Sequence, residues 1–455
     1  MAPGIFYQHL GEHICGDFIP FYDRKSGRYH LFYIQWNAWH HISTADFVDI
    51  AYHGIALDGE GEQAQDQCIY TGCVMEKDGL YYIYFTGHND FPEKNGLRYK
   101  EVIYRATSPD LMTWTKDRQF VLPPDETRFS TNSWRDPHIM RMEDGRYIMT
   151  LTAEEKDKPS HRKGCTPTYV SDDMLNWEYA GVLYSPTVYD TQECTDLFKW
   201  GDWYYLFFST ANNAWETHYR MARSLDGPWL RAPEDTIDAQ AFYAAKTVTD
   251  GQNRYLVGWA SNKDNKTDGG WYSWGGRLVV HQLVQAADGT LGAKAPDAVC
   301  GAFTQPQALP DTTFRSTRED AFTYVPLGEA AEGEELLFTG KLRTVNDARP
   351  ARAGLILRAQ NGSLDEYYRL CIEMPRNRVF LSYPGQFFTP YREQKHLPHP
   401  AKDVTFTVIV SEDLIVAYVG GAAFTARIYD YKAGQFGLFF EECDAEIADL
   451  RIWKR

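Results

Sequence analysis

Short runs of aromatic and β-branched residues recur along the first part of the chain, and each run follows a turn that contains Gly or Asp. Five copies, among them SGRYHLFYIQW and WGDWYYLFFST, stand at 26–36, 77–88, 143–153, 200–210 and 251–261. Their starts lie at intervals of roughly 50 to 65 residues. Because the runs are short and bounded by turns, they predict β-strands and not helices.

A second motif follows several of these runs and combines a Ser, an acidic turn residue and a terminal aromatic. It reads STADFVDI at 43–50, SPDLMTW at 108–114, SDDMLNW at 171–177 and SLDGPW at 224–229. We interpret it as the hairpin that leads into the outer strand of each repeat. Repeat length, strand content and copy number together predict a five-bladed β-propeller, with a generic β-sandwich as the alternative.

The pattern changes after the fifth copy. Residues 291–316 are rich in Ala and Pro and have no strand period, which is typical of a linker. Strand patterns then resume without the repeat motif, as in DVTFTVIV, where alternate apolar residues would share one face. The sequence therefore predicts an all-β chain with a propeller catalytic domain at 1–298, a linker at 299–316 and a β-sandwich domain at 317–455.

Length and charge narrow the classes of function. A chain of 455 residues exceeds what one hydrophobic core usually supports, which favours two domains. The 46 Lys and Arg residues against 62 Asp and Glu residues give a net charge of −16. Nucleic acids and anionic membranes need a basic face, so neither is an expected partner. The charge suits a protein that acts on a neutral ligand.

Cysteine usage and the termini bear on the compartment. The eight cysteines include no Cys-x-x-Cys pair, which indicates reduced, mostly buried thiols and no zinc or redox motif. The segment MAPGIFYQHLGEHICGDF lacks a basic stretch followed by an apolar run, and no apolar stretch is long enough to span a membrane. We therefore expect a cytoplasmic protein, or a secreted one if the chain has been trimmed.

Three acidic residues, Asp17, Asp136 and Glu193, open or flank copies of the repeat. Carboxylates carried by three copies of one repeat predict a single acidic pocket on the pseudo-symmetry axis. Aromatic residues make up 15 % of the chain. An acidic pocket in an aromatic-rich protein suits the hydrolysis of a sugar, in which one carboxyl donates a proton and another attacks or stabilises an oxocarbenium-like centre.

The neighbours of two of these residues add information. Pro137 pushes Asp136 into an extended conformation, and the adjacent Arg135 would keep that carboxylate ionised and offer donors to sugar hydroxyls. Glu193 near two other carboxylates would hold its proton more tightly, as a general acid must. Structural alternatives stay open: a turn role for Asp17, an Arg–Asp pair for Asp136 and a surface position for Glu193.

Several motifs in order resemble those of glycoside hydrolase family 32, the β-fructofuranosidases (invertases, inulinases and levanases). WRDPHI at 134–139 resembles the family's Arg-Asp-Pro motif, and QECTDLF at 192–198 resembles its Glu-Cys motif. Segments 39–47, 70–88 and 271–280 resemble further motifs of the family. The C-terminal tail resembles the end of the family's sandwich domain, so the resemblance covers nearly the whole chain.

The resemblance implies a five-bladed propeller followed by a β-sandwich, and a retaining double-displacement mechanism without metal or organic cofactor. Asp17 would be the nucleophile that forms a fructosyl-enzyme, Glu193 the general acid/base and Asp136 the stabiliser of the transition state. The Asp17 and Glu193 carboxyls of a retaining pair should lie roughly 5–5.5 Å apart. The residues that we expect to contact the carbohydrate substrate are Gln35, Trp36, Trp39, Tyr70, Arg135 and Trp274.

The first motif departs from the family pattern. The family usually has Asn-Asp-Pro-Asn-Gly, where this chain has Gly16, Asp17, Phe18, Ile19 and Pro20. The nucleophile position is kept, while the Asn neighbours that shape the terminal-sugar pocket are absent. We therefore expect cleavage of a terminal β-fructofuranosyl residue from an oligosaccharide, a fructan, or a fructose disaccharide or dianhydride.

Two alternatives of function stay open. One is an inverting arabinofuranosidase or xylosidase similar to family 43, whose carboxyls would lie roughly 6.5–9.5 Å apart. The other is a sugar-binding propeller that has lost catalysis. The second domain has three candidate roles, namely to buttress the propeller, to bind polysaccharide or to form a homo-oligomer interface.

Overall fold

The computed structural model describes the chain except residues 1–3, 10–13, 212–214, 345–350, 362–363 and 384–392. Within the described residues the helical elements are α1 (Asp297–Gly301) and two 3-10 turns, η1 (Asp264–Lys266) and η2 (Met374–Arg376). All other regular structure is strand, so the predicted all-β class is confirmed. No described helix has the length and apolar character that crossing a membrane requires.

Residues 16–294, called here the five-sheet unit, form five separate antiparallel sheets, of which the fourth has three strands and the others four. In chain order their strands are β1 (Gly16–Asp23), β2 (Arg28–Gln35), β3 (Ala38–Thr44) and β4 (Ile50–Leu57); β5 (Cys68–Lys77), β6 (Leu80–His88), β7 (Glu101–Ser108) and β8 (Thr115–Leu122); β9 (Phe129–Arg141), β10 (Tyr147–Glu155), β11 (Gly164–Ser171) and β12 (Glu178–Tyr184); β13 (Glu193–Trp200), β14 (Trp203–Thr210) and β15 (Glu216–Ala222); β16 (Phe242–Thr249), β17 (Arg254–Lys263), β18 (Tyr272–Gln285) and β19 (Leu291–Lys294).

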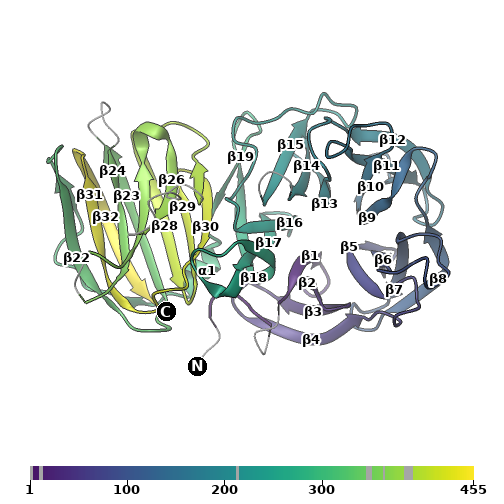
Figure 1. Cartoon of the computed structure of the whole chain (residues 1–455), viewed down its shortest axis with the longest axis horizontal. Helices are drawn as coiled ribbons and strands as arrows, with labels where there is room; N and C mark the ends of the chain where they lie inside the picture. Colours follow the sequence, from purple (N-terminus) through teal and green to yellow (C-terminus); the bar gives the residue numbers. More distant parts are fainter. Residues whose placement is uncertain (1–3, 10–13, 212–214, 345–350, 362–363, 384–392) are drawn as a thin grey trace.

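The five sheets stand around a common centre, with the first strand of each sheet innermost (Figure 1). These first strands contact one another in succession: β1 with β5, β5 with β9, β9 with β13, β13 with β16 and β16 with β1. The five runs predicted as strands form the second strands β2, β6, β10, β14 and β17. Most of their residues are buried, which explains why these runs are nearly continuously apolar instead of alternating.

In the first three sheets the second motif forms a tight turn between the third and fourth strands, and its fourth copy, at 224–229, follows β15, the last strand of its sheet. The Asp110 carboxylate accepts hydrogen bonds from the backbone N–H groups of Met112, at 2.9 Å, and Thr113, at 2.8 Å. Asp173 holds the N–H groups of Leu175 and Asn176 in the same way, at 2.7 and 2.8 Å. The motif is therefore a side-chain-stabilised turn that directs the chain into the outer strand.

Each of the five first strands has an irregular register with its neighbour near its start. The non-glycine residues with positive φ at these places are Asp17 (49°), Asp136 (57°), Cys194 (54°) and Ala244 (50°). The extended conformation expected for Asp136 from the following Pro137 is therefore wrong, because the bulge places Asp136 in the left-handed region. A bulge of this kind turns successive side chains to the same side of a strand. It therefore allows neighbouring residues to point together towards the centre of the molecule.

Residues 305–454, called here the two-sheet unit, form two sheets over a shared core (Figure 1). The seven-stranded sheet contains β20 (Gln305–Pro306), β21 (Phe314–Ser316), β23 (Leu336–Thr344), β28 (Asp403–Ser411), β29 (Leu414–Val419), β30 (Ala422–Arg427) and β32 (Ala445–Lys454). The six-stranded sheet contains β22 (Phe322–Ala330), β24 (Arg352–Ala359), β25 (Tyr368–Glu373), β26 (Arg378–Ser382), β27 (Gln394–His396) and β31 (Gly434–Glu441). Phe338 and Phe424 of the first sheet and Leu355 and Phe436 of the second belong to one buried cluster.

The stretch 299–316, expected to be a linker, contains ordered elements. It includes the end of α1, and both β20 and β21 pair with β32. Part of this stretch thus extends the edge of the two-sheet unit. The domain boundaries at 298 and 316 stay a prediction.

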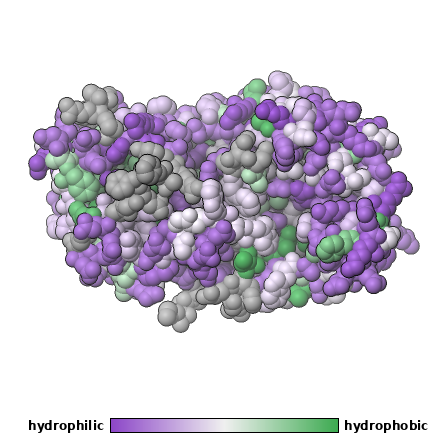
Figure 2. Space-filling view, in the orientation of Figure 1, coloured by the Kyte–Doolittle hydropathy of each residue, from purple (hydrophilic) through white to green (hydrophobic). Residues whose placement is uncertain are grey.

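The exposed face is mostly hydrophilic and the cysteines are mostly buried, as expected from the sequence. Figure 2 shows a mostly hydrophilic face on which hydrophobic residues form only small, separate groups. All eight cysteines are free; Cys300 is half-buried, and the other seven are buried.

Candidate active site

A cavity of about 490 Å³ opens at the centre of the five-sheet unit. It is lined by the starts of the first strands and by neighbouring turns, with the residues Asp17, Ile34, Trp36, Asn37, Cys68, Tyr70, Arg135, Asp136, Glu193, Cys194, Ala211, Trp215, Tyr243 and Trp274. Its volume is in the usual range for small-molecule sites. The structure thus brings together the three acidic residues singled out in the sequence, each from a different sheet.

Asp136 is the most enclosed of the three carboxylates. Its side chain is buried, and Oδ2 accepts hydrogen bonds from the Cys194 N–H at 2.8 Å and the Thr152 hydroxyl at 3.0 Å. The Asp136 N–H donates to the Thr86 hydroxyl at 2.9 Å. Burial raises the pKa of Asp136, and the neighbouring Arg135 guanidinium opposes this effect. These contacts fix the carboxylate at the base of the cavity.

Glu193 is held by a cation and a phenol. Arg135 Nη2 lies 2.7 Å from Oε1, and the Tyr243 hydroxyl donates to Oε2 at 2.7 Å. The guanidinium of Arg135 also lies 3.7 Å from Asp136 Oδ2 and 3.5 Å from Glu101 Oε2. The Arg135 guanidinium therefore lies within ion-pair distance of three carboxylates. A quarter of the Glu193 side chain (25 %) stays exposed to the cavity.

Asp17 has fewer contacts to offset its charge. The Trp259 indole donates to Oδ1 at 3.2 Å. Burial raises the pKa of Asp17 to about 7, and the charges of Asp136 and Glu193 add to the effect. Like-charge repulsion, expected from the sequence for Glu193, therefore acts on Asp17.

The predicted aromatic contacts divide into two groups. Trp36, which is 71 % exposed, and Trp274, which is 38 % exposed, line the cavity together with Tyr70. Gln35 and Trp39, also predicted to contact the substrate, are instead fully buried and do not line it.

The local structure explains why these two residues lie outside the lining. Residues 36 and 37 form the turn between β2 and β3 and reach the cavity, whereas Gln35 ends β2 and Trp39 packs in the cluster between the first two sheets. The Trp39 indole donates to the Tyr70 carbonyl at 3.0 Å, so Trp39 supports a lining residue from behind.

Several residues of the site were not predicted from the sequence. Tyr243 and Trp259, which bind the carboxylates of Glu193 and Asp17, resemble ordinary core aromatics in the sequence. A signal for Tyr243 exists: it lies near the start of the first strand of the fifth repeat, directly before the left-handed Ala244, as Glu193 lies directly before the left-handed Cys194. Lys246 was also missed; its buried ammonium donates to carbonyl oxygens of β5 and β13 below the carboxylates.

Asp196, three residues after Glu193, has structural contacts and does not line the cavity. It is buried, its carboxylate accepts the Thr247 N–H, and Oδ1 lies 3.1 Å from His138 Nε2.

Across the part of the chain that the structure describes, no group of three or more His, Cys, Asp or Glu side chains is suited to hold a metal ion. The site therefore offers carboxyl, guanidinium, phenol and indole groups for chemistry.

Comparison with known proteins identifies curated relatives. The chain is similar to raffinose invertase of Escherichia coli, with 24% identity over 458 residues that cover 94% of this chain and 90% of the relative. Sucrose-6-phosphate hydrolase of Escherichia coli is 24% identical over 88% of this chain and 84% of its own length.

Solved structures share the fold. Fructan 1-exohydrolase IIa from Cichorium intybus superimposes with a TM-score of 0.76 at 15% identity, covering 99% of this chain and 97% of that one. Exo-inulinase from Aspergillus awamori gives a TM-score of 0.75 at 15% identity, with the same coverage.

The family model that describes the N-terminal domain of glycosyl hydrolases family 32 matches residues 20–291. The match begins just after Asp17, in agreement with the divergent first motif. Because it spans more than half of the chain, and because invertase-like relatives cover most of the remainder, the chain belongs to glycoside hydrolase family 32 and is a fructofuranosidase-like glycoside hydrolase.

Proposed function

We propose that this enzyme is a retaining β-fructofuranosidase that removes terminal β-fructofuranosyl residues from a neutral fructoside through a covalent fructosyl-enzyme. Its architecture would be a five-bladed β-propeller followed by a β-sandwich. One observation carries the proposal: Asp17, Asp136 and Glu193, each from the first strand of a different sheet, line one cavity in a family 32 chain.

The contacts of each carboxyl suit a distinct role. An Asp17 oxygen bonds to the anomeric carbon as the bond to the leaving oxygen breaks, and Glu193 gives its proton to that oxygen. Glu193 then takes a proton from water, whose oxygen bonds to the anomeric carbon as the bond to Asp17 breaks. Asp136, fixed by two donors, holds sugar hydroxyls as positive charge develops on the ring.

The charge of the cavity argues for a neutral substrate. Among the lining residues that the structure describes, three are carboxylates and Arg135 is the one cation. That guanidinium already pairs with Glu193 and approaches Asp136. A phosphate would face net negative charge, and the described lining residues include no second cation to bind it, which costs binding energy. We therefore propose sucrose-like or fructan-like substrates in preference to the sugar phosphate that names the Escherichia coli relative.

The test is fructose release from sucrose, sucrose 6-phosphate, inulin, levan, fructose disaccharides and difructose dianhydrides. Asp17→Asn and Glu193→Gln are the test variants, and Asp202→Asn, an exposed carboxylate at 88% side-chain exposure, is the matched control. We expect release that Asp17→Asn and Glu193→Gln abolish and Asp202→Asn leaves intact. A kcat/KM higher for sucrose 6-phosphate than for sucrose would contradict the neutral-substrate proposal.

Stereochemistry tests the retaining mechanism separately. With methanol as acceptor, a retaining enzyme gives methyl β-fructofuranoside, because both displacements invert at the anomeric carbon. An α product would support the inverting reading, and arabinose release from aryl arabinofuranosides would support another furanoside as substrate. No product from the folded protein with any of these substrates would favour a sugar-binding role.

A further inference from the structure

The two-sheet unit reaches the candidate active site through strand β17. We propose that Arg427, at the end of β30, is a positioning residue for Asp17: it holds the backbone of β17 so that the Trp259 indole meets the Asp17 carboxylate. The inference rests on the role of Asp17 under the proposed function. It gives the two-sheet unit a part in catalysis without any contact with the substrate.

Arg427 lies fully buried between the two units. Its Nε donates to the Ser261 carbonyl at 2.9 Å and its Nη2 to the Ala260 carbonyl at 2.7 Å. Its Nη1 lies 2.7 Å from Asp413 Oδ1 within the two-sheet unit, which compensates the buried charge. The planar guanidinium therefore fixes two successive carbonyls of β17 relative to a carboxylate of the other unit.

These two carbonyls lie next to the residue that contacts Asp17. Trp259 directly precedes Ala260, is fully buried, and donates its indole N–H to Asp17 at 3.2 Å. The pairing of β17 with β18 shifts register just after Ser261. The Ser261 N–H still donates to the Ala241 carbonyl at 2.6 Å, and the guanidinium adds a further constraint where the pairing with β18 becomes irregular.

A second connection runs from the same corner to Asp17. A Cβ on Gly276 would lie 1.7 Å from the Ala260 carbonyl oxygen and 3.1 Å from Arg427 Nη2, so only glycine permits this close approach. The Gly276 N–H donates at 2.7 Å to the carbonyl of Cys15, two residues before Asp17. Displacement of β17 at Ala260 would therefore disturb both the indole donor and the backbone that carries the carboxylate.

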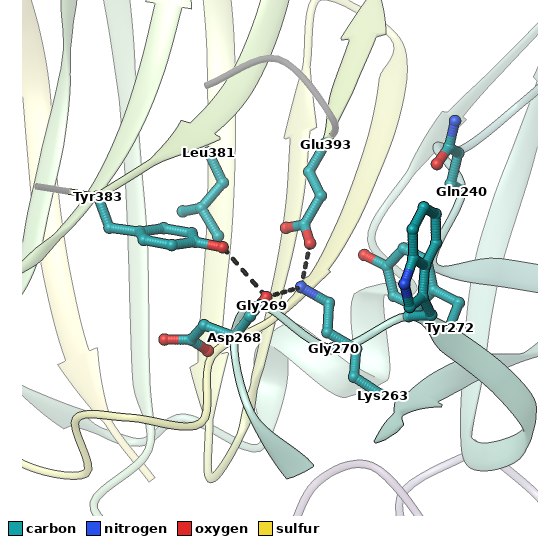
Figure 3. Close-up of a pocket in the computed structure, with 10 residues that line it drawn as sticks. Gln240, Lys263, Asp268, Gly269, Gly270, Tyr272, Leu381, Tyr383 and Glu393 are labelled. Atoms are coloured by element: carbon teal, nitrogen blue, oxygen red, sulfur yellow. Dashed lines mark hydrogen bonds and ion pairs between the residues drawn. The ribbon is translucent and has the colours of Figure 1, made fainter. Parts of the chain in front are cut away.

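The end of β17 is attached to the two-sheet unit once more. Lys263 forms a buried ion pair with Glu393 and donates to the Asp268 carbonyl at 2.9 Å, to which the Tyr383 hydroxyl donates at 3.1 Å (Figure 3). These contacts border a cavity of about 220 Å³ between the units. The strand that carries Trp259 is thus held from outside its own sheet at residues 260, 261 and 263.

The test compares Arg427→Lys and Arg427→Met with Lys395→Met. Lys395 also crosses between the units, with Glu234 at 3.2 Å and Thr236 at 2.7 Å, but does not contact β17. A lysine at 427 keeps the charge and cannot hold both carbonyls and Asp413. We expect Arg427→Lys to lower kcat on the preferred fructoside by roughly tenfold or more with little change in KM, since binding groups stay in place. Lys395→Met should alter neither constant.

Two readouts separate positioning from general destabilisation. In the Trp259→Phe background the effect of Arg427→Lys should largely disappear, because the two residues act through one hydrogen bond. The acidic limb of kcat/KM should move to higher pH in Arg427→Lys, as in Trp259→Phe, because the indole favours ionised Asp17. If Arg427→Met does not fold, Asp413→Asn, which frees one arm of the guanidinium, replaces it with a smaller expected effect.

A further measurement does not depend on turnover. The difference in Tm that Asp17→Asn causes at pH 8 is measured with Arg427 and with Arg427→Lys, and we expect the two differences to be unequal. Additive Tm values, together with kinetics of Arg427→Lys that match those of Lys395→Met, would overturn the inference while leaving the proposed function intact. Absence of hydrolysis by the unsubstituted enzyme would instead reject the proposed function, and the Tm comparison would still decide on Arg427.

Discussion

Asp17 receives little stabilisation for the negative charge that its proposed role as nucleophile requires. Arg135 and Tyr243 bind Glu193, and Cys194 and Thr152 donate to Asp136, whereas the described donor to Asp17 is one indole at 3.2 Å. A weakly paired carboxylate is reactive, but it is also readily protonated. The same environment therefore bears on both rate and pH dependence.

The first prediction concerns the pH profile. Because the pKa of Asp17 is raised to about 7 and the proposed attack requires its carboxylate form, kcat/KM on sucrose should fall tenfold per pH unit below about 7. Sucrose has no ionisable group in this range, so the limb reports the free enzyme. A profile flat from pH 8 down to 5 would mean that Asp17 is ionised throughout and would contradict the prediction.

The second prediction is that Asp17→Asn, which should abolish activity, raises the stability of the folded protein. A pKa raised from 3.8 to about 7 means that the folded state binds the Asp17 proton more tightly than the unfolded state. The free energy by which this proton stabilises the folded state is present below about pH 4 and is lost as pH rises through about 7. Asp17→Asn removes the charge, so we expect its Tm to exceed that of the unsubstituted protein by several degrees at pH 8. At pH 4 the two Tm values should be nearly equal, and the exposed Asp202→Asn should change Tm at neither pH.

The carboxylates and Arg135 could be predicted from the sequence, whereas the buried residues that support them, such as Trp259, Tyr243 and Lys246, could not. Asp17, Asp136, Arg135 and Glu193 interrupt strand patterns, which makes them visible. Trp259 acts through one indole N–H and is otherwise a fully buried core residue, so nothing in the sequence separates it from Trp39, which lies behind the site. The distinction depends on which side of a strand each ring occupies, and bulges decide that.

At the scale of elements, bulges at the starts of the first strands shape the site. The left-handed residues Asp17, Asp136 and Cys194 each lie in the cavity lining. Without such a bulge, neighbours such as Arg135 and Asp136 would point to opposite faces of the strand. The fifth first strand repeats the feature at Ala244, beside Tyr243, although no carboxylate is present there.

The third prediction uses two adjacent alanines. Ala244 has φ of 50°, which costs a residue with a Cβ about 1–2 kcal/mol, so Ala244→Gly should be neutral or stabilising. Ala245 is equally buried and has no such φ; Ala245→Gly should destabilise by about 1 kcal/mol. Urea unfolding monitored by tryptophan fluorescence compares the two. A larger loss for Ala244→Gly than for Ala245→Gly would show that the left-handed backbone is not under strain.

The second strands were the most predictable elements. Their apolar runs are set by burial between neighbouring sheets, as in β2 and β14, and do not depend on register. The first strands were harder, because a bulge breaks the alternation that a reader of the sequence looks for. Likewise β20 and β21 escaped notice within 299–316, since strands of two and three residues at a sheet edge tolerate Pro and have no readable period.

At the scale of the whole molecule, one buried hydrophobic cluster extends across the boundary between the two units. Leu278 and Leu283 of β18 belong to the same buried cluster as Ile409, Leu414 and Val416 of the two-sheet unit. A buried polar network also crosses this boundary. Asp238 of the five-sheet unit accepts hydrogen bonds from the Thr425 N–H at 2.7 Å and from the Thr425 hydroxyl, and it lies 2.9 Å from His281. The sequence change near residue 298 indicated two units, but it could not indicate how tightly they are joined.

This joint core leads to the last prediction, that the full chain unfolds as one unit. Loss of either unit would expose the apolar residues of β18 or β29 and leave Asp238 and Arg427 without their partners, so neither unit should persist after the other unfolds. Calorimetry should give one peak with equal calorimetric and van't Hoff enthalpies. Val416→Ala, in the shared core, and Val379→Ala, in the core of the two-sheet unit alone, should each lower the Tm of that single peak. Two resolved peaks, with Val379→Ala moving only one of them, would show that the units unfold independently. The coupling between Arg427 and Asp17 would then have to act between two units that unfold separately.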